Sequence, residues 1–211
     1  MKTAILFDLD GTLLDTLADL HAAVNHVMRR FGYPTHSREA VCNFVGNGAE
    51  QLIRLAVPEG ADWQPVLAAF QSYYAGHCDV LTRPYDGIEA MIAQLAGKYP
   101  LAVVSNKPDR AVKELAKVYF PTLYARGESA DCPRKPAPDM VRLAMQALQA
   151  DTCIYIGDSD VDICTAKNAG VPCISVTWGF RSKQQLLCAG GEVFCDHPSQ
   201  LPEMIERILY R

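Results

Sequence analysis

Two aspartates near the start of the chain are spaced so that their carboxylates can act together. Asp8 and Asp10 follow the apolar run 3–7 and precede Gly11. A spacing of two residues at a strand end places both side chains on one face, with Cα atoms about 6.6 Å apart. Like charges this close repel unless a cation lies between them, or unless one carboxyl is a nucleophile and the other an acid. The alternative is an ordinary Asp-Gly turn.

Two further polar clusters lie where a strand is expected to meet a helix. Ser105-Asn106-Lys107 directly follows the apolar run 101–104, and its hydroxyl and backbone N–H groups at a helix N-terminus favour an anion site. A helix cap is the alternative there. Lys135 precedes Pro136 in a proline-rich segment, which would fix its ammonium before the next helix. The alternative for this lysine is a solvated surface position.

An acidic cluster follows the apolar run 153–156. Its oxygen ligands suit Mg²⁺, and its carboxylates include Asp158, Asp160 and Asp162. The same spacing begins a calcium-binding EF-hand loop, but Ile163 stands where that loop needs Gly and Ala169 where it needs Glu. The cluster therefore favours a magnesium site at the end of a strand.

The elements that must position these clusters alternate between strands and helices. Strands are expected at 3–7, 101–104, 153–156 and 173–176, with helices at 87–97, 108–118, 138–149 and 160–169. This alternation predicts an α/β fold, a Rossmann-like three-layer core with a parallel sheet and helices on both faces. Since the carboxyl ends of parallel strands meet at one edge, the polar clusters should lie together.

One long segment, 16–83, contains helical patterns and no convincing strand. The spacing of its apolar residues predicts helices over about 17–31, 37–46, 49–56 and 63–78, the second capped by Ser37. We therefore expect a discontinuous core domain formed by residues 1–15 and 84–211, with residues 16–83 inserted as an all-helical cap domain.

Composition excludes several classes of protein. The 211 residues include 20 Lys and Arg against 24 Asp and Glu, a net charge of −4, and no basic block marks a nucleic-acid or anionic membrane surface. No apolar run approaches the ~18 residues of a membrane span. The eight cysteines form no C-x-x-C pair, and several lie in apolar runs, which favours reduced thiols and a cytoplasmic location.

In their types and order, the four clusters resemble those of the haloacid dehalogenase superfamily of phosphotransferases, and the resemblance spans essentially the whole chain. The helical insertion is similar to the cap that this superfamily places after its first strand. Four segments further resemble the phosphoglycolate phosphatase subgroup: Val45-Gly46-Asn47-Gly48, Tyr85-Asp86-Gly87, Ser105-Asn106-Lys107 and Gly157-Asp158-Ser159. Sugar-phosphate phosphatases, pyrophosphatases and phosphomutases share most of these segments.

The resemblance implies a role for each residue of the core clusters. Asp8 would be the nucleophile that forms an aspartyl-phosphate, and Asp10 the general acid and base. Mg²⁺ would be held by Asp8, the Asp10 carbonyl and Asp158, with Asp162 holding ligands or metal-bound waters in place. Ser105, the Asn106 N–H and Lys135 would neutralise charge on the phosphoryl oxygens. Thr12 would orient the Asp8 loop, and Lys107 would bind the substrate.

The cap is expected to close over the substrate and determine specificity, hinging near Asp15-Thr16 and Arg83-Pro84. Candidate contacts to the leaving group are Gly46, Asn47 and Gly48, with Arg54 either a further contact or part of a solvated face. The resemblance implies Mg²⁺-dependent hydrolysis of a small phosphate monoester, with 2-phosphoglycolate as the first candidate substrate. The protein is expected to act as a monomer or a homodimer. Alternatives are a sugar phosphomutase, a sugar-phosphate phosphatase or pyrophosphatase, and a non-enzymatic phospho-receiver.

Overall fold

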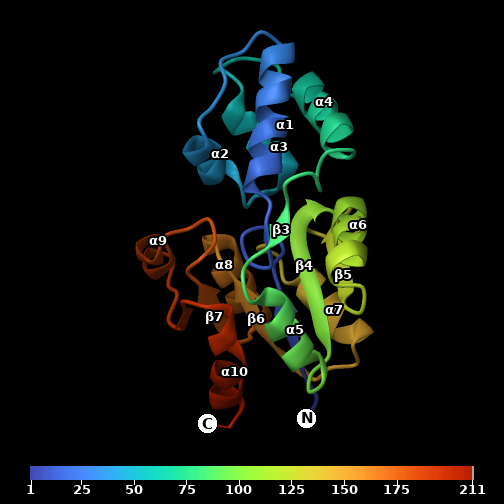
Figure 1. Ribbon diagram of the computed structural model, residues 1–211, viewed down its shortest axis with the longest axis vertical. Helices are drawn as coiled ribbons and strands as arrows, with labels where there is room; N and C mark the ends of the chain where they lie inside the picture. Colours follow the sequence, from blue (N-terminus) through green and yellow to red (C-terminus); the bar gives the residue numbers. More distant parts are fainter. Residues whose placement is uncertain (211) are drawn as a thin grey trace.

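The chain folds around a six-stranded sheet in which all neighbouring strands are parallel (Figure 1). The computed structural model describes residues 1–210, and its strands lie in the order β5-β4-β1-β6-β7-β8. Their bounds are β1 (Thr3–Phe7), β4 (Leu101–Pro108), β5 (Tyr124–Glu128), β6 (Thr152–Gly157), β7 (Cys173–Val176) and β8 (Phe194–Cys195). The N-terminal strand β1 is therefore central, with β4 and β6 as its neighbours.

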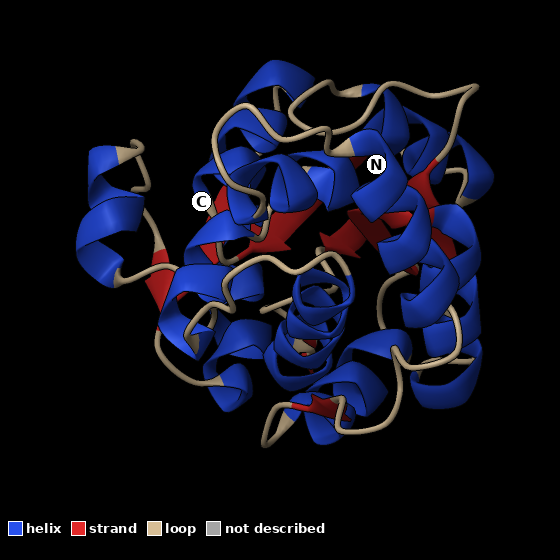
Figure 2. Ribbon diagram, turned by 90° about the horizontal axis from the view of Figure 1, so that it is seen from above, coloured by secondary structure: helices blue, strands red, loops and turns tan. Residues whose placement is uncertain are grey.

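Helices cover both faces of this sheet, which confirms the predicted α/β core of three layers (Figure 2). Alternate residues of β1 enter two separate apolar clusters, Ile5 and Phe7 on one face and Ala4 and Leu6 on the other. The core helices are α5 (Ile88–Ala96), α6 (Asp109–Tyr119), α7 (Asp139–Ala147), α8 (Asp160–Ala169), α9 (Lys183–Cys188) and α10 (Leu201–Leu209), with the short 3₁₀ helix η1 (Pro198–Gln200).

The observed elements differ from the predicted ones mainly at the edges of the sheet. The strand predicted at 101–104 continues to Pro108, because its polar end stays paired with β5 through Glu128. The edge strands β5 and β8 and the helices α9 and α10 were not predicted. Edge strands are partly exposed, so their residues do not form the continuous apolar run that marks a central parallel strand.

Four helices form a second lobe around an apolar cluster of their own, shown at the top of Figure 1. They are α1 (Leu17–Arg30), α2 (Arg38–Phe44), α3 (Gly48–Ala56) and α4 (Gln64–Tyr74). The predicted cap of Ser37 is confirmed, since the Ala40 N–H donates to its hydroxyl at 3.1 Å. The boundaries at residues 16 and 83 stay a prediction; we refer to the four helices as the cap lobe.

A two-stranded antiparallel ladder joins the lobes, formed by β2 (Leu14–Asp15) and β3 (Arg83–Pro84). The returning segment beside it is held by Asp19 of α1. Its buried carboxylate accepts the backbone N–H groups of residues 80–82 at 2.9 to 3.0 Å, and the Thr82 hydroxyl at 2.8 Å. One side chain of the cap lobe therefore fixes the path of the chain back to the core.

Two further features of the structure concern membrane-spanning helices and cysteines. Within residues 1–210, no helix combines the length and apolar character needed to cross a membrane. All eight cysteines are free thiols.

We expect Asp19→Ala to destabilise the protein by about 3 kcal/mol, because it leaves several buried N–H groups without an acceptor. Urea denaturation followed by circular dichroism measures the change in the free energy of unfolding. Glu39→Ala, on the exposed first turn of α2, is the control and should change that energy by less than about 0.5 kcal/mol. Equal stability of Asp19→Ala and the wild type would contradict this role for Asp19.

Candidate active site

The polar clusters meet at the carboxyl edge of the central strands. Asp8 directly follows β1, and its N–H donates to the Ile156 carbonyl of β6 at 2.9 Å. Ser105 and Lys107 lie at the end of β4, and Asp158 directly follows β6. This arrangement follows from the parallel sheet, because the order β4-β1-β6 places these strand ends side by side.

Lys135 lies between two buried carboxylates. Its Nζ is 2.8 Å from Asp8 Oδ1 and 2.8 Å from Asp162 Oδ1, and it also donates to the Tyr155 hydroxyl at 3.1 Å. Burial disfavours the charge, but the carboxylates of Asp162 and Asp8 outweigh it and raise the pKa of Lys135 well above its usual value. The lysine is therefore a fixed cation beside Asp8.

The Asn106 side chain binds the backbone of Lys135. Its side-chain oxygen accepts the Lys135 N–H at 2.7 Å, and its amide donates to the Lys135 carbonyl at 3.0 Å and to the Gly46 carbonyl of the cap lobe at 3.1 Å. Asn106 thus connects β4, the lysine loop and the cap lobe.

Asp158 is held by hydrogen bonds from two other loops. The Thr12 hydroxyl donates to its Oδ1 at 2.9 Å, and the Phe180 N–H donates to its Oδ2 at 2.7 Å. Glycines are needed where the chain passes this carboxylate: Gly11 has a φ of +86°, and a Cβ there or at Gly179 would lie 2.3 Å from an Asp158 atom. Both loops therefore approach the carboxylate more closely than a larger residue allows.

Three carboxylates form a group that fits a divalent cation. Oxygens of Asp8, Asp158 and Asp162 lie within 4.8 Å of one another, and all three residues are buried. Burial is the main cause that raises the pKa of Asp8 to about 7 and that of Asp158 to about 8; neighbouring carboxylates add to both shifts, and Lys135 opposes the shift of Asp8. A hard cation would remove this repulsion.

The oxygens of these carboxylates are not equally available. Asp8 Oδ1 forms an ion pair with Lys135 Nζ at 2.8 Å and has no other polar partner among residues 1–210. Asp162, in contrast, is occupied on both oxygens, by Lys135 at 2.8 Å and by the Ser159 hydroxyl at 2.6 Å. Asp158 likewise accepts a hydrogen bond on each oxygen, from Thr12 and Phe180, so hydrogen bonding does not separate it from Asp162, and all three carboxylates remain candidate ligands.

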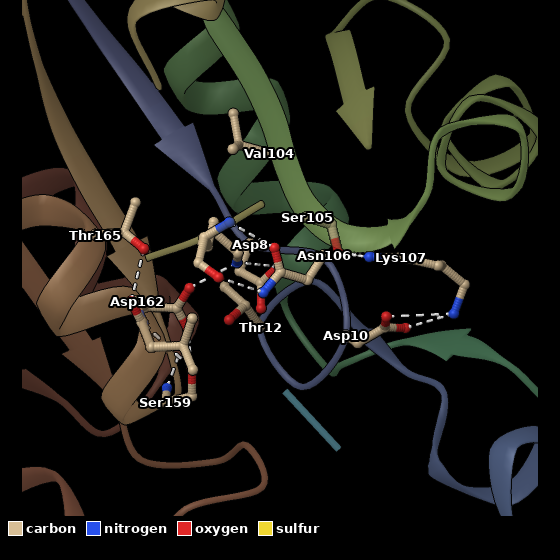
Figure 3. Close-up of polar contacts among 12 residues, drawn as sticks. Asp8, Asp10, Thr12, Val104, Ser105, Asn106, Lys107, Ser159, Asp162 and Thr165 are labelled. Carbon is tan, nitrogen blue, oxygen red and sulfur yellow. Dashed lines mark hydrogen bonds and ion pairs between the residues drawn. The ribbon is translucent and has the colours of Figure 1, made fainter. Parts of the chain in front are cut away.

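Asp10 lies apart from this group and faces Lys107 (Figure 3). Lys107 Nζ donates to Asp10 Oδ1 at 2.9 Å, to Asp10 Oδ2 at 3.2 Å and to the Tyr74 hydroxyl of the cap lobe at 2.7 Å. The Asp10 carboxylate is thus separate from the metal group, and the predicted ligand role of its carbonyl stays a prediction.

A cavity of about 50 Å³ lies between the strand ends and the cap lobe. Its cap side is mainly apolar, with Leu20, Val45, Ala49, Leu52 and Phe70. Gly46 and Gly48 also line it from the cap side. Its core side is lined by nine predicted residues or their neighbours in the motifs: Asp8, Asp10, Ser105, Asn106, Lys107, Pro108, Lys135, Asp158 and Ser159.

Four predicted or candidate residues lie elsewhere in the described chain. Thr12 and Asp162 do not line the cavity; their side chains bind Asp158 and Lys135 instead. Asn47 is also absent from the lining. Arg54 pairs with Glu50 at 2.9 Å and covers the Trp63 ring at 4.1 Å, so the solvated-face alternative describes it and the contact to a leaving group does not.

Three residues of the site were missed by sequence reasoning. Arg181 lines the cavity and donates to the cap-lobe carbonyls of Cys42 and Val45. It follows the end of β7, so the strand-end argument could have found it. Tyr155 lies inside an apolar run, and Tyr74 comes from the last turn of a cap-lobe helix, so nothing in the pattern distinguishes either from a core residue.

A parallel sheet with a buried lysine beside Asp8, and with three carboxylates that could hold a cation at its strand ends, is typical of a hydrolase for phosphoryl chemistry. The chain belongs to the haloacid dehalogenase-like hydrolases, whose family model matches residues 5–176. It is 34% identical to a phosphoglycolate phosphatase from Rhodobacter capsulatus, with 98% of each chain covered. It is 32% identical to an N-acetylmuramic acid 6-phosphate phosphatase from Pseudomonas aeruginosa, with 98% of this chain and 96% of the relative covered.

A solved structure extends the similarity to three dimensions. The crystal structure of a candidate phosphoglycolate phosphatase from Lactobacillus delbrueckii subsp. bulgaricus superposes with a TM-score of 0.91 at 38% identity. The alignment covers 97% of this chain and 99% of that one, so it includes both the sheet and the cap lobe.

We expect the metal-free protein to lose stability as pH rises from about 4 to about 8. The folded-state pKa values of Asp8 and Asp158, about 7 and about 8, lie above the ordinary value of 3.8. Folded protein therefore binds more protons than unfolded protein in this window, and the free energy of unfolding falls with rising pH. Denaturant titrations at several pH values in the presence of a chelator should show a decrease of at least about 1 kcal/mol.

Millimolar Mg²⁺ should restore stability at the upper end of this range, because it binds only the folded state. Asp158→Asn should flatten the pH dependence and weaken the Mg²⁺ effect, whereas Asp62→Asn, an exposed control, should change neither. A pH-independent wild type without metal would contradict the account.

Proposed function

We propose that the chain hydrolyses a small phosphate monoester through a phosphorylated Asp8, with Mg²⁺ as its metal. The first candidate substrate is 2-phosphoglycolate. The observation that carries this proposal is the position of Asp8. Its buried carboxylate lines the cavity between the lobes, and its Oδ1 lies 2.8 Å from the Lys135 ammonium with no other polar partner among residues 1–210.

The reaction has two displacements at phosphorus. In the first, an Asp8 carboxylate oxygen forms a bond to phosphorus, the ester P–O bond breaks, and protonated Asp10 gives its proton to the departing oxygen. In the second, Asp10 takes a proton from water as the water oxygen attacks phosphorus. The Asp8–phosphorus bond then breaks, which releases phosphate and returns both side chains to their starting state.

The surrounding residues stabilise the charge that develops on the phosphoryl oxygens. Lys135 lies beside Asp8, and the Ser105 hydroxyl and the Asn106 N–H come from the adjacent strand end. Loss of one such contact costs roughly 10²- to 10³-fold in rate. When bound by Asp8 and Asp158, Mg²⁺ supplies further positive charge at the same oxygens.

The size of the cavity supports a small leaving group. A volume of about 50 Å³ suits a two-carbon acid better than an N-acetylated sugar. The Rhodobacter relative named for phosphoglycolate supports the first substrate. The Pseudomonas relative named for N-acetylmuramic acid 6-phosphate makes that sugar phosphate the second candidate.

The location and assembly of the enzyme stay predictions. Eight free thiols support a reducing compartment such as the cytoplasm.

We expect phosphate release from 2-phosphoglycolate to require Mg²⁺ and to exceed release from N-acetylmuramic acid 6-phosphate at equal concentration. Asp8→Asn should lower kcat at least about 10⁴-fold, because it removes the nucleophile. A continuous phosphate assay with and without Mg²⁺ measures both effects, with Asp62→Asn as the matched control.

Each other outcome has a distinct meaning. Faster release from the sugar phosphate would keep the mechanism and replace the substrate. Return of the phosphoryl group to a sugar phosphate without release of phosphate would instead support a phosphomutase. Full activity of Asp8→Asn would refute the aspartyl-phosphate mechanism.

A further inference from the structure

Tyr74 belongs to the cap lobe, but its hydroxyl reaches the core. It ends α4, is only 5% exposed and lines the cavity. Its ring stacks on Phe70 with centroids 5.2 Å apart, which holds it in place. The hydroxyl accepts from Lys107 Nζ at 2.7 Å, and Lys107 lies at the end of β4. This hydrogen bond therefore joins the two lobes across the cavity.

The same ammonium also holds Asp10. Lys107 Nζ donates to the two Asp10 oxygens at 2.9 and 3.2 Å, and its side chain is 3% exposed. A lysine has only three N–H donors, so Tyr74 and Asp10 share the available directions. The ammonium makes all three contacts charge-assisted, and the contact to the Tyr74 hydroxyl, at 2.7 Å, is shorter than either contact to the Asp10 carboxylate. Tyr74 thus competes effectively with Asp10 for Lys107.

The two partners of Lys107 sit on opposite sides of the hinge. Asp10 is part of the loop after β1, whereas Tyr74 would move with the cap lobe about the β2–β3 ladder. If the lobes separate, Lys107 loses Tyr74 and keeps Asp10. When the cap lobe is closed, the Lys107 ammonium donates to both Tyr74 and Asp10. When the cap lobe is open, it donates to Asp10 alone.

We propose that Tyr74 is a positioning residue, whose hydroxyl holds Lys107 and so places the Asp10 carboxyl for the leaving oxygen only while the cap lobe is closed. The inference rests on the proposed function, in which Asp10 protonates that oxygen. Its consequence is that proton delivery is coupled to closure, when the cavity excludes bulk water.

Tyr74→Phe tests this role because it removes one hydroxyl and keeps the ring. The chain offers a matched control in Tyr73→Phe, the same substitution one residue earlier in α4. The Tyr73 ring stacks between His26 and His77, and its hydroxyl makes no hydrogen bond within residues 1–210. Thermal melting of both variants checks that each is folded.

The decisive readout is the rate of phosphoenzyme formation, measured by rapid quench with two donors. 2-Phosphoglycolate needs a proton on its departing alkoxide, whereas acetyl phosphate releases acetate, a stable anion that needs none. Tyr74→Phe should slow formation from 2-phosphoglycolate about tenfold, the loss of one hydrogen bond to a charged group, and from acetyl phosphate less than about twofold. Adding Tyr74→Phe to Lys107→Met should have no further effect.

The outcomes separate this inference from the proposed function. An active wild type with equal rates in Tyr74→Phe and Tyr73→Phe would overturn the inference alone. Equal slowing with both donors would also overturn it, because a merely mispacked cap lobe affects both alike. Failure of wild-type protein to form a phosphoenzyme from either donor would overturn the proposed function and this inference together.

Discussion

The ammonium of Lys135 lies between the carboxylates of Asp8 and Asp162, 2.8 Å from each, and the arrangement of the strand ends depends on it. Buried carboxylates so close together repel, and one cation among them offsets part of that cost. The lysine is held in turn by Asn106 from β4 and by the Tyr155 hydroxyl from β6. Three neighbouring elements are therefore tied to one charge.

The cap lobe completes the site with few polar groups. Its side of the cavity is mainly apolar, and Tyr74 brings a hydroxyl to the core. Arg181 and Asn106 bind cap-lobe carbonyls from the core side, so the closed arrangement is held by core side chains on cap backbone. The polar and charged side chains of the cavity, Lys107 and Arg181 among them, therefore come mainly from the core, and the cap lobe contributes mainly apolar ones.

Sequence reasoning was most successful where a residue's chemistry and its position in an element agree. Asp8, Ser105 and Asp158 each end a buried strand, and parallel strands necessarily bring such ends to one edge. It could not identify the partner of Thr12, which comes from another strand end, and it left two alternatives open for Arg54, of which the solvated face describes the structure. Thr12 binds Asp158, and Arg54 pairs with Glu50 beside Trp63. Spacing places a side chain on a face but does not choose among the groups that face it.

The sequence by itself determined the α/β core, the helical insertion and the strand ends that carry Asp8 and Asp158, because local periodicity and residue type fix those features. Tertiary structure alone decided which charges meet. The pairing of Asp10 with Lys107, the pairing of Asp162 with Lys135 and the contact of Tyr74 across the lobes arise between residues far apart in the chain. Such contacts depend on how the strand ends and the two lobes pack together, and no local pattern encodes that geometry.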